Sequence, residues 1–151
     1  MPTAIAWNAS DALIVDASVW VSAADASDAL SAPSRSFLTT VARQRTPIVL
    51  PAIARLEVAC ALTRRLHDAR RGRKLAERLL QSPLITEIPL DAPLLAAALT
   101  QGTKSFLRAG DAFYAAVARN GGGTLIAWDD ELVRRAGAMT PEAWLVKYGG
   151  D

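Results

Sequence analysis

ALIVDASVW, residues 12–20, is the stretch of sequence that decides the fold. Its continuous apolar run, Ala12–Val15, is typical of a short strand that is buried on both faces, as in a parallel sheet. The run ends at Asp16, and a helical pattern follows over Ser18–Ala24. The stretch therefore predicts an α/β domain with an acid at the carboxyl end of its first strand.

Short apolar runs and helical patterns alternate along the rest of the chain, with a loop expected over Asp25–Ser34. The further expected strands are Ile48–Leu50, Ile85–Leu90, Thr124–Ala127 and a short Ala138–Thr140. The further expected helices are Ser36–Arg45, Pro51 to about His67, Arg73–Leu80, Asp91–Thr100, Leu107–Arg119, Asp129–Gly137 and Pro141–Tyr148. Pro89 should make the Ile85–Leu90 strand an edge strand or a short one. The alternation predicts one α/β/α sandwich over residues 1–151 with a mostly parallel sheet.

The composition is that of one globular domain. The chain has 151 residues, is 51% hydrophobic and carries a formal net charge of +2, which does not by itself indicate a nucleic-acid partner. Its single cysteine, Cys60, excludes an intrachain disulfide and is expected in the core. No Lys or Arg precedes Arg35, and no apolar run approaches the roughly 20 residues of a membrane span. We therefore expect a cytoplasmic protein without a membrane partner.

Two acids follow strands. Asp16 directly follows the first strand, and Asp129 comes shortly after the strand at Thr124–Ala127. The carboxyl ends of parallel strands lie along one edge of the sheet, where ligands bind, so these two carboxylates should share that edge. An Asp after a strand is also a common helix N-cap, and the sequence alone leaves both interpretations open.

Two further acids interrupt apolar helices. Glu57 lies in PAIARLEVACAL with no basic residue at helical spacing, and burying such an unpaired carboxylate is costly. Asp111 lies in LRAGDAFYAAVA, three residues after Arg108, which could form a surface pair with it. Gly110 beside it suggests a helix start or a close backbone approach.

Together, Asp16, Glu57, Asp111 and Asp129 have the composition of a site for a hard cation. Mg²⁺ and Mn²⁺ prefer carboxylate oxygens, whereas Zn²⁺ is disfavoured because the chain has one His and one Cys. Two such ions would activate a water and stabilise the leaving oxygen of a phosphodiester. The acids therefore predict metal-dependent nuclease chemistry.

Four motifs in order, LIVDASVWVSA, PAIARLEVACAL, RAGDAFYAAVA and TLIAWDDELV followed by TPEAWL, resemble the PIN-domain family, most closely its VapC-type toxin branch. The likeness runs from about Ala12 to Leu145. It implies a Rossmann-like sheet of about five parallel strands, a homodimer, Mg²⁺- or Mn²⁺-dependent endoribonuclease activity and a cognate VapB-type antitoxin. The family's acids match Asp16, Glu57, Asp111 and Asp129, and Ser18 matches a supporting hydroxyl residue.

One departure from the family lies near the last acid. The family often has Thr or Ser two residues before it, where this chain has Ala127. Asp130 adds a second acid beside Asp129. We favour Asp129 as the metal ligand and Asp130 as a supporting residue, because Asp130 and Glu131 are typical first-turn helix acids.

A basic segment between residues 55 and 78 is a further candidate for function. Arg64, Arg65, Arg70 and Arg71 belong to it, and they form either a solvated helical face or a track for RNA phosphates beside the acids.

Other functions fit less well or remain open. A phosphatase of the haloacid dehalogenase type needs an Asp at position 18, which is Ser18, and a receiver domain needs a Lys near its fifth strand, whereas the only late lysine is Lys147. A catalytically inactive PIN-like module that binds RNA or protein remains the alternative.

Overall fold

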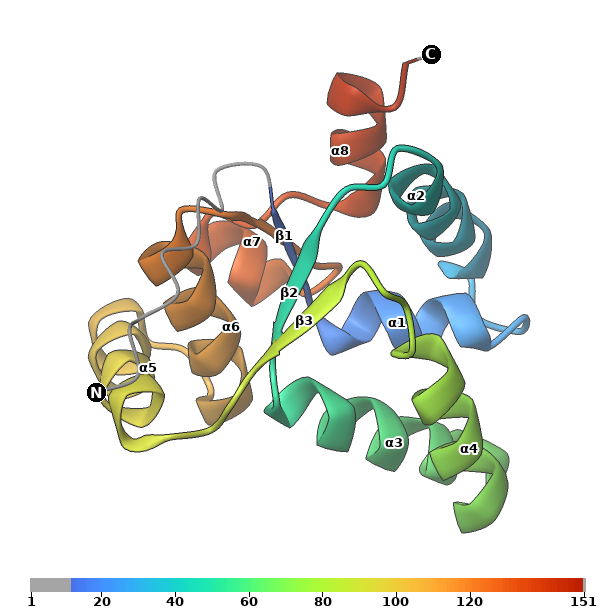
Figure 1. Ribbon diagram of the computed structural model, residues 1–151, viewed down its shortest axis with the longest axis horizontal. Coiled ribbons are helices and arrows are strands. Elements are labelled where there is room, and N and C mark those ends of the chain that lie inside the picture. The colour runs from blue at the N-terminus through green and yellow to red at the C-terminus, as the bar shows by residue number, and fades with distance from the viewer. Residues whose placement is uncertain (1–11, 151) are drawn as a thin grey trace.

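The computed structural model describes residues 12–150, in which a parallel sheet separates two layers of helices (Figure 1). The predicted domain extends over residues 1–151, so its first 11 residues and Asp151 lie outside the described residues. The strands are β1 (Leu13–Val15), β2 (Ile48–Pro51), β3 (Ile85–Ile88) and β4 (Thr124–Ile126). All neighbouring strands pair in parallel, in the order β3-β2-β1-β4. The predicted α/β/α fold is confirmed.

Helices cover both faces of this sheet. They are α1 (Ala17–Ala24), α2 (Ser31–Arg43), α3 (Ile53–Leu66), α4 (Ala69–Leu79), α5 (Ala92–Ser105), α6 (Ala109–Gly121), α7 (Asp130–Ala136) and α8 (Pro141–Tyr148). Figure 1 shows α5, α6 and α7 on one side of the sheet and α1 to α4 with α8 on the other. Among the described residues, no helix is both long and apolar enough to span a membrane.

The core forms where the central strands meet these helices. Every residue of β1 is buried, as expected for the middle of a parallel sheet covered on both faces. Tyr114 of α6 and Phe37 of α2 are fully buried on opposite sides, and Phe37 meets Trp144 of α8 edge-on with ring centroids 5.2 Å apart. Helix α6 lies against the central strands, so the residues at its start are held close to their carboxyl ends.

The chain order of the strands creates one switch point. From β1 the chain moves outward to β2 and β3, and then returns to place β4 on the other side of β1. In parallel α/β sheets, ligands bind in the crevice at the carboxyl ends of two strands that diverge in this way. Here those strands are β1, followed by Asp16, and β4, followed by Asp129.

The structure corrects several boundaries. Helix α2 begins at Ser31, inside the expected loop, and the expected strand at Ala138–Thr140 is only a single bridge between Ile126 and Met139. The sheet of the described residues therefore has four strands instead of about five. The edge position of β3, which ends just before Pro89, is confirmed.

Two residue-level expectations also change. Helix α4 begins at Ala69, so Gly72 lies inside the helix and not before it. The glycine allows α4 to pack closely on α3, since a Cβ at Gly72 would lie 2.4 Å from Thr63 Oγ1. Cys60 is exposed, and its expected core position is wrong. Cys60 lies one turn after Leu56 on the exposed face of α3, whereas Val58 and Leu62 are buried in the core.

Candidate metal centre

Asp16 lies at the end of β1 and is almost fully buried. Its Oδ2 atom accepts a hydrogen bond from the Ser18 amide at 3.1 Å, so it caps α1 as one of the two interpretations predicts. Burial raises the pKa of Asp16, although hydrogen bonds from Ser18 oppose the shift and the nearby Asp111 and Asp129 add to it. Asp16 is thus a helix cap that also lies within the electrostatic reach of two other acids.

Asp129 caps α7 with only one of its two oxygens. Oδ1 accepts the amides of Glu131 at 2.8 Å and Leu132 at 3.3 Å. Oδ2 contacts the Arg108 guanidinium instead. The capping interpretation and the site interpretation are therefore compatible, because each uses a different oxygen.

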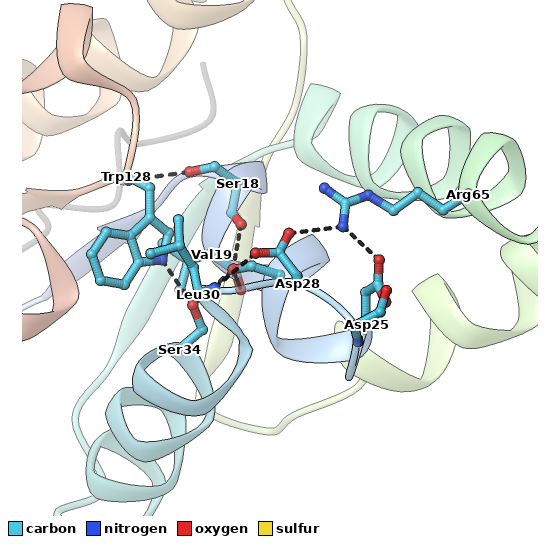
Figure 2. A network of polar contacts seen from close by, with 10 residues as sticks. Ser18, Val19, Asp25, Asp28, Leu30, Ser34, Arg65 and Trp128 are labelled. Atoms are coloured by element: carbon cyan, nitrogen blue, oxygen red, sulfur yellow. Dashed lines mark hydrogen bonds and ion pairs between the residues drawn. The ribbon is translucent and has the colours of Figure 1, made fainter.

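The turn that carries Asp129 is held by Trp128 (Figure 2). The Trp128 amide donates to Ser18 Oγ at 3.2 Å, and its indole Nε1 donates to Ser34 Oγ at 2.8 Å. Ser34 Oγ in turn lies 2.7 Å from Ser22 Oγ of α1. These bonds tie the end of β4 to α1 and α2, so they restrict where Asp129 can lie. Ala127 itself is fully buried and offers no hydroxyl.

Asp111 lies in the first turn of α6 and is buried. Its Oδ2 accepts a hydrogen bond from Nε of Arg108, the N-cap residue of α6, at 3.1 Å, and this is the pair that the sequence suggests. Burial raises the pKa of Asp111. The negative charges of Asp129 and Glu131 raise it further, whereas Arg108 lowers it. One arginine therefore does not compensate this carboxylate fully.

Glu57 reaches the same region from α3. Its Oε1 is buried without a hydrogen-bond partner, as is the hydroxyl of Tyr114. Burial raises the pKa of Glu57, and the nearby charges of Asp16 and Asp111 raise it further. The Tyr114 hydroxyl lies near Glu57 without a well-formed hydrogen bond and lowers its pKa. A Cβ at Gly110 would lie 2.9 Å from Glu57 Oε2, so the close approach suggested by this glycine is real.

The structure adds one acid that the sequence pattern does not single out. Asp111, Asp129 and Glu131 each offer an oxygen, and these oxygens lie within 4.8 Å of one another. Glu131 looks like an ordinary first-turn acid, and only its spacing of two residues from Asp129 signals more. Asp130 points elsewhere, because its Oδ2 pairs with Arg134 Nε at 2.8 Å and its side chain is exposed.

The donors of this centre fit a divalent cation. They are carboxylate oxygens with a tyrosine hydroxyl close by, which suits Mg²⁺ or Mn²⁺ and not a softer metal. A buried carboxylate oxygen without a partner is costly, and a bound cation would relieve that cost. Asp16 and Glu57 both interact electrostatically with Asp111, so the residues predicted from separate motifs lie at one edge of the sheet.

A groove of about 1460 Å³ opens beside the centre between α1, α3 and α4, and Glu57 and Trp128 are part of its lining. Arg64 lines the groove and is exposed. Arg70 and Arg71 on α4 are also exposed. Arg65 differs, since its Nη1 pairs with Asp25 Oδ2 at 2.7 Å and Asp28 Oδ2 at 2.8 Å (Figure 2).

Solved structures share this fold at low sequence identity. PAE2754 from Pyrobaculum aerophilum is 20% identical with a TM-score of 0.71, over 94% of this chain and 92% of that one. VapC20 from Mycobacterium tuberculosis, a sarcin-ricin loop cleaving toxin, is 22% identical with a TM-score of 0.68, over 84% and 96%. A toxin-antitoxin complex from Klebsiella pneumoniae contains a chain that is 16% identical with a TM-score of 0.58, over 85% and 97%.

At these identities the structures show a common fold and do not transfer an activity. No protein with a curated description matches the chain. The sequence model of the PIN domain family matches residues 13–138, which include all four predicted acids. This chain therefore belongs to the PIN domain family.

Proposed function

We propose that this protein is a metal-dependent endoribonuclease that hydrolyses RNA phosphodiesters, as the toxin of a VapBC-type toxin–antitoxin pair in the cytoplasm. The observation that carries the proposal is the buried, unpartnered Oε1 of Glu57 beside Asp111, at the switch point between β1 and β4. The fold shared with a sarcin-ricin loop cleaving toxin supports RNA as the substrate.

Asp16, Glu57, Asp111 and Asp129 would hold Mg²⁺ or Mn²⁺, and Glu131 is the fifth acid within reach. A bound ion would supply Lewis-acid chemistry, lowering the pKa of a water and stabilising the leaving oxygen. The protein's own contribution is rigidity. Amides of α1 and α7 fix one oxygen each of Asp16 and Asp129, while Ser18 and Trp128 hold the two strand ends together. Asp130 pairs with Arg134 and does not point toward the set.

The basic segment supplies an RNA track in this proposal. Arg64 lines the groove and is exposed, and Arg70 and Arg71 are exposed on α4, whereas Arg65 is engaged with two acids. Phosphate contacts release counterions, so replacing Arg64, Arg70 and Arg71 with Ala should weaken RNA binding at all sequences and flatten its salt dependence. An unchanged salt slope would assign the segment to an ordinary solvated face or to an antitoxin contact.

A VapB-type antitoxin is the proposed protein partner. Leu56 on the groove wall is 62% exposed, and Leu30 also lines the groove. A groove with exposed apolar side chains beside an acidic site suits a segment that both docks and blocks access. The similar fold of a chain in a toxin-antitoxin complex supports such a partner.

A homodimer is the proposed assembly. Leu95 and Leu99 lie one turn apart on α5 and are 60% and 66% exposed, and Phe106 at the end of α5 is also exposed. Apolar side chains that share a surface mark an association face. Leu95→Glu with Leu99→Glu should therefore shift the mass measured by light scattering from dimer to monomer.

The deciding experiment compares cleavage of structured and unstructured RNA with Mg²⁺, with Mn²⁺ and with chelator. Asp16→Asn is the key variant, because Asn also caps helices well and should leave α1 intact. Glu142→Gln, an exposed acid of α8, is the matched control for loss of one charge. Cleavage that needs the metal and is lost only in Asp16→Asn supports the enzyme.

The opposite result favours the other candidate. Wild-type protein that binds RNA or protein but cleaves no RNA with either ion would be a binding module with a PIN fold. Cleavage that persists in Asp16→Asn would contradict the acid centre itself.

A further inference from the structure

Arg108 lies across the mouth of the acid centre. Its Nε is 3.1 Å from Asp111 Oδ2 and 3.6 Å from Glu131 Oε2, and its Nη2 contacts Asp129 Oδ2. These three carboxylates are the ones whose oxygens lie within 4.8 Å of one another. One guanidinium therefore contacts every member of this compact acidic group.

The oxygens that Arg108 uses are the ones a metal would need. Asp129 Oδ1 is engaged by two amides of α7, so Oδ2 is the oxygen that remains for a ligand. Arg108 holds this oxygen and also Oδ2 of Asp111. A guanidinium and a divalent cation at the same oxygens would be like charges only a few ångströms apart, where their repulsion is strong.

Arg108 is also free to leave. Its side chain is 66% exposed, and the ion pairs described for it all lead to these acids. Arg135 shows the contrast, because it pairs with Glu131 at 3.6 Å but also donates to the Phe106 carbonyl at 2.6 Å, which anchors it. Because the guanidinium lies largely in solvent, these ion pairs are weaker and break more readily than pairs with both partners buried.

We propose that Arg108 is the built-in counterion of this centre, and that a divalent cation binds by displacing it from Asp111 and Asp129. The inference deepens the proposed function and depends on the metal centre described there. In the metal-free protein, Arg108 limits the repulsion among the acids. The same contacts make it a competitor, so it sets how much free cation is needed to fill the site.

The test is Mn²⁺ binding without RNA, measured by calorimetric titration on wild-type protein, Arg108→Gln and Arg134→Gln. Arg134 is the matched control, because it is an exposed arginine nearby on α7 whose partner, Asp130, lies outside the compact group. Loss of the three ion pairs of the exposed Arg108 side chain should tighten Mn²⁺ binding about tenfold in Arg108→Gln. Arg134→Gln should change it less than about twofold, since charges at longer range are screened.

A third variant, Arg108→Lys, keeps the inference testable if Arg108→Gln does not fold. Arg108→Lys keeps the charge but cannot bridge carboxylates with a planar fork, so its Mn²⁺ affinity should lie between wild type and Arg108→Gln. Equal affinity in wild type and Arg108→Gln would overturn this inference alone. Equal tightening in Arg134→Gln would also overturn it, by showing a general charge effect. No Mn²⁺ binding by any of these proteins would instead overturn the proposed metal enzyme.

Discussion

Arg65 and Arg108 each bridge two or more carboxylates, yet the two regions differ in how well their acids are compensated. Arg65, near the end of α3, pairs with Asp25 and Asp28 in the connection from α1 to α2. Hydrogen bonds from Ser27 to Asp25 and from the Leu30 amide to Asp28, together with Arg65, lower the pKa of both acids. At Arg108, burial raises the pKa of Asp111 even though the arginine is in contact.

The difference teaches how to distinguish a structural ion cluster from a functional one. The Arg65 cluster is satisfied, because each acid has a local donor and the arginine adds to it. The Arg108 cluster keeps an excess of negative charge. Arg108 and Arg135 pair with three acids, and the carboxylates of Asp16 and Glu57, which form no ion pair among the described residues, lie within electrostatic reach of Asp111. Carboxyl groups whose pKa is raised at a switch point are candidates for function, whereas acids whose pKa is lowered by local hydrogen bonds in a loop are better explained as structural.

The largest expected difference is in activity. Asp111→Asn should lower the Mn²⁺-dependent cleavage rate about a thousandfold, because losing a metal ligand removes several kcal/mol of transition-state stabilisation. Asp25→Asn should change the rate less than about threefold, since it weakens only the Arg65 cluster. Rate measurements on both variants test the comparison, and similar losses in the two would contradict it.

The next difference is in thermal stability. Arg65→Gln should lower the melting temperature by about 2–4 °C, and Mn²⁺ should not restore the loss. Arg108→Gln should also melt lower without metal, because its acids then repel one another. If it binds Mn²⁺ about tenfold tighter, saturating Mn²⁺ adds about 1.4 kcal/mol relative to wild type, or about 3–6 °C.

Melting curves of both variants with Mn²⁺ and with chelator provide the measurement. Mn²⁺ responses of equal size in Arg65→Gln and Arg108→Gln would mean that the two clusters do not differ in metal binding.

The two regions should also respond to pH with opposite signs. Asp111 has a raised pKa when folded, so its contribution to stability is present below the ordinary value of 3.8 and is lost as pH rises through the folded pKa. Asp28 has a lowered pKa, so its contribution is present above 3.8 and is lost as pH falls through the folded pKa.

Denaturant unfolding of metal-free protein over a series of pH values checks this prediction. Relative to wild type, Asp111→Asn should gain stability as pH rises from 3.8 through the folded pKa of Asp111. Asp28→Asn should lose stability relative to wild type as pH rises from the folded pKa of Asp28 to 3.8. Each slope is limited to about 1.4 kcal/mol per pH unit for one proton. Slopes of the same sign would remove the electrostatic contrast between the clusters.

The smallest expected effect concerns the contacts that connect the two regions. The Leu30 amide donates to Asp28 Oδ1 at 2.8 Å, the Ser34 amide donates to the Leu30 carbonyl at 3.1 Å, and Trp128 Nε1 donates to Ser34 Oγ at 2.8 Å (Figure 2). Trp128→Phe and Ser34→Ala should each cost about 1 kcal/mol of unfolding free energy, the value of a typical hydrogen bond. The double variant should cost clearly less than their sum, and additive losses would show that this hydrogen bond contributes nothing.

Much of the fold was predictable from local patterns. The apolar run that ends at Asp16 predicts the buried strand β1, because such a short run is typical of a strand covered on both faces. Pro89 predicts that β3 is an edge strand or a short one, since proline cannot donate in a sheet, and β3 is an edge strand. The start of α2 and the place of Gly72 were not predictable, because packing between helices overrides local propensity there.

By itself, the sequence determined an α/β chain with isolated acids after strands and within apolar helices. Both features follow from local patterns, namely the periodicity of apolar residues and the cost of burying a charge among them. Only the tertiary structure decided which charges meet. Arg108 reaches Asp129 across 21 residues, and Arg65 reaches Asp25 across 40. Gly110 admits Glu57 from another helix. Such contacts depend on strand order and helix packing, which place distant segments within the few ångströms over which ion pairs and metal ligands act.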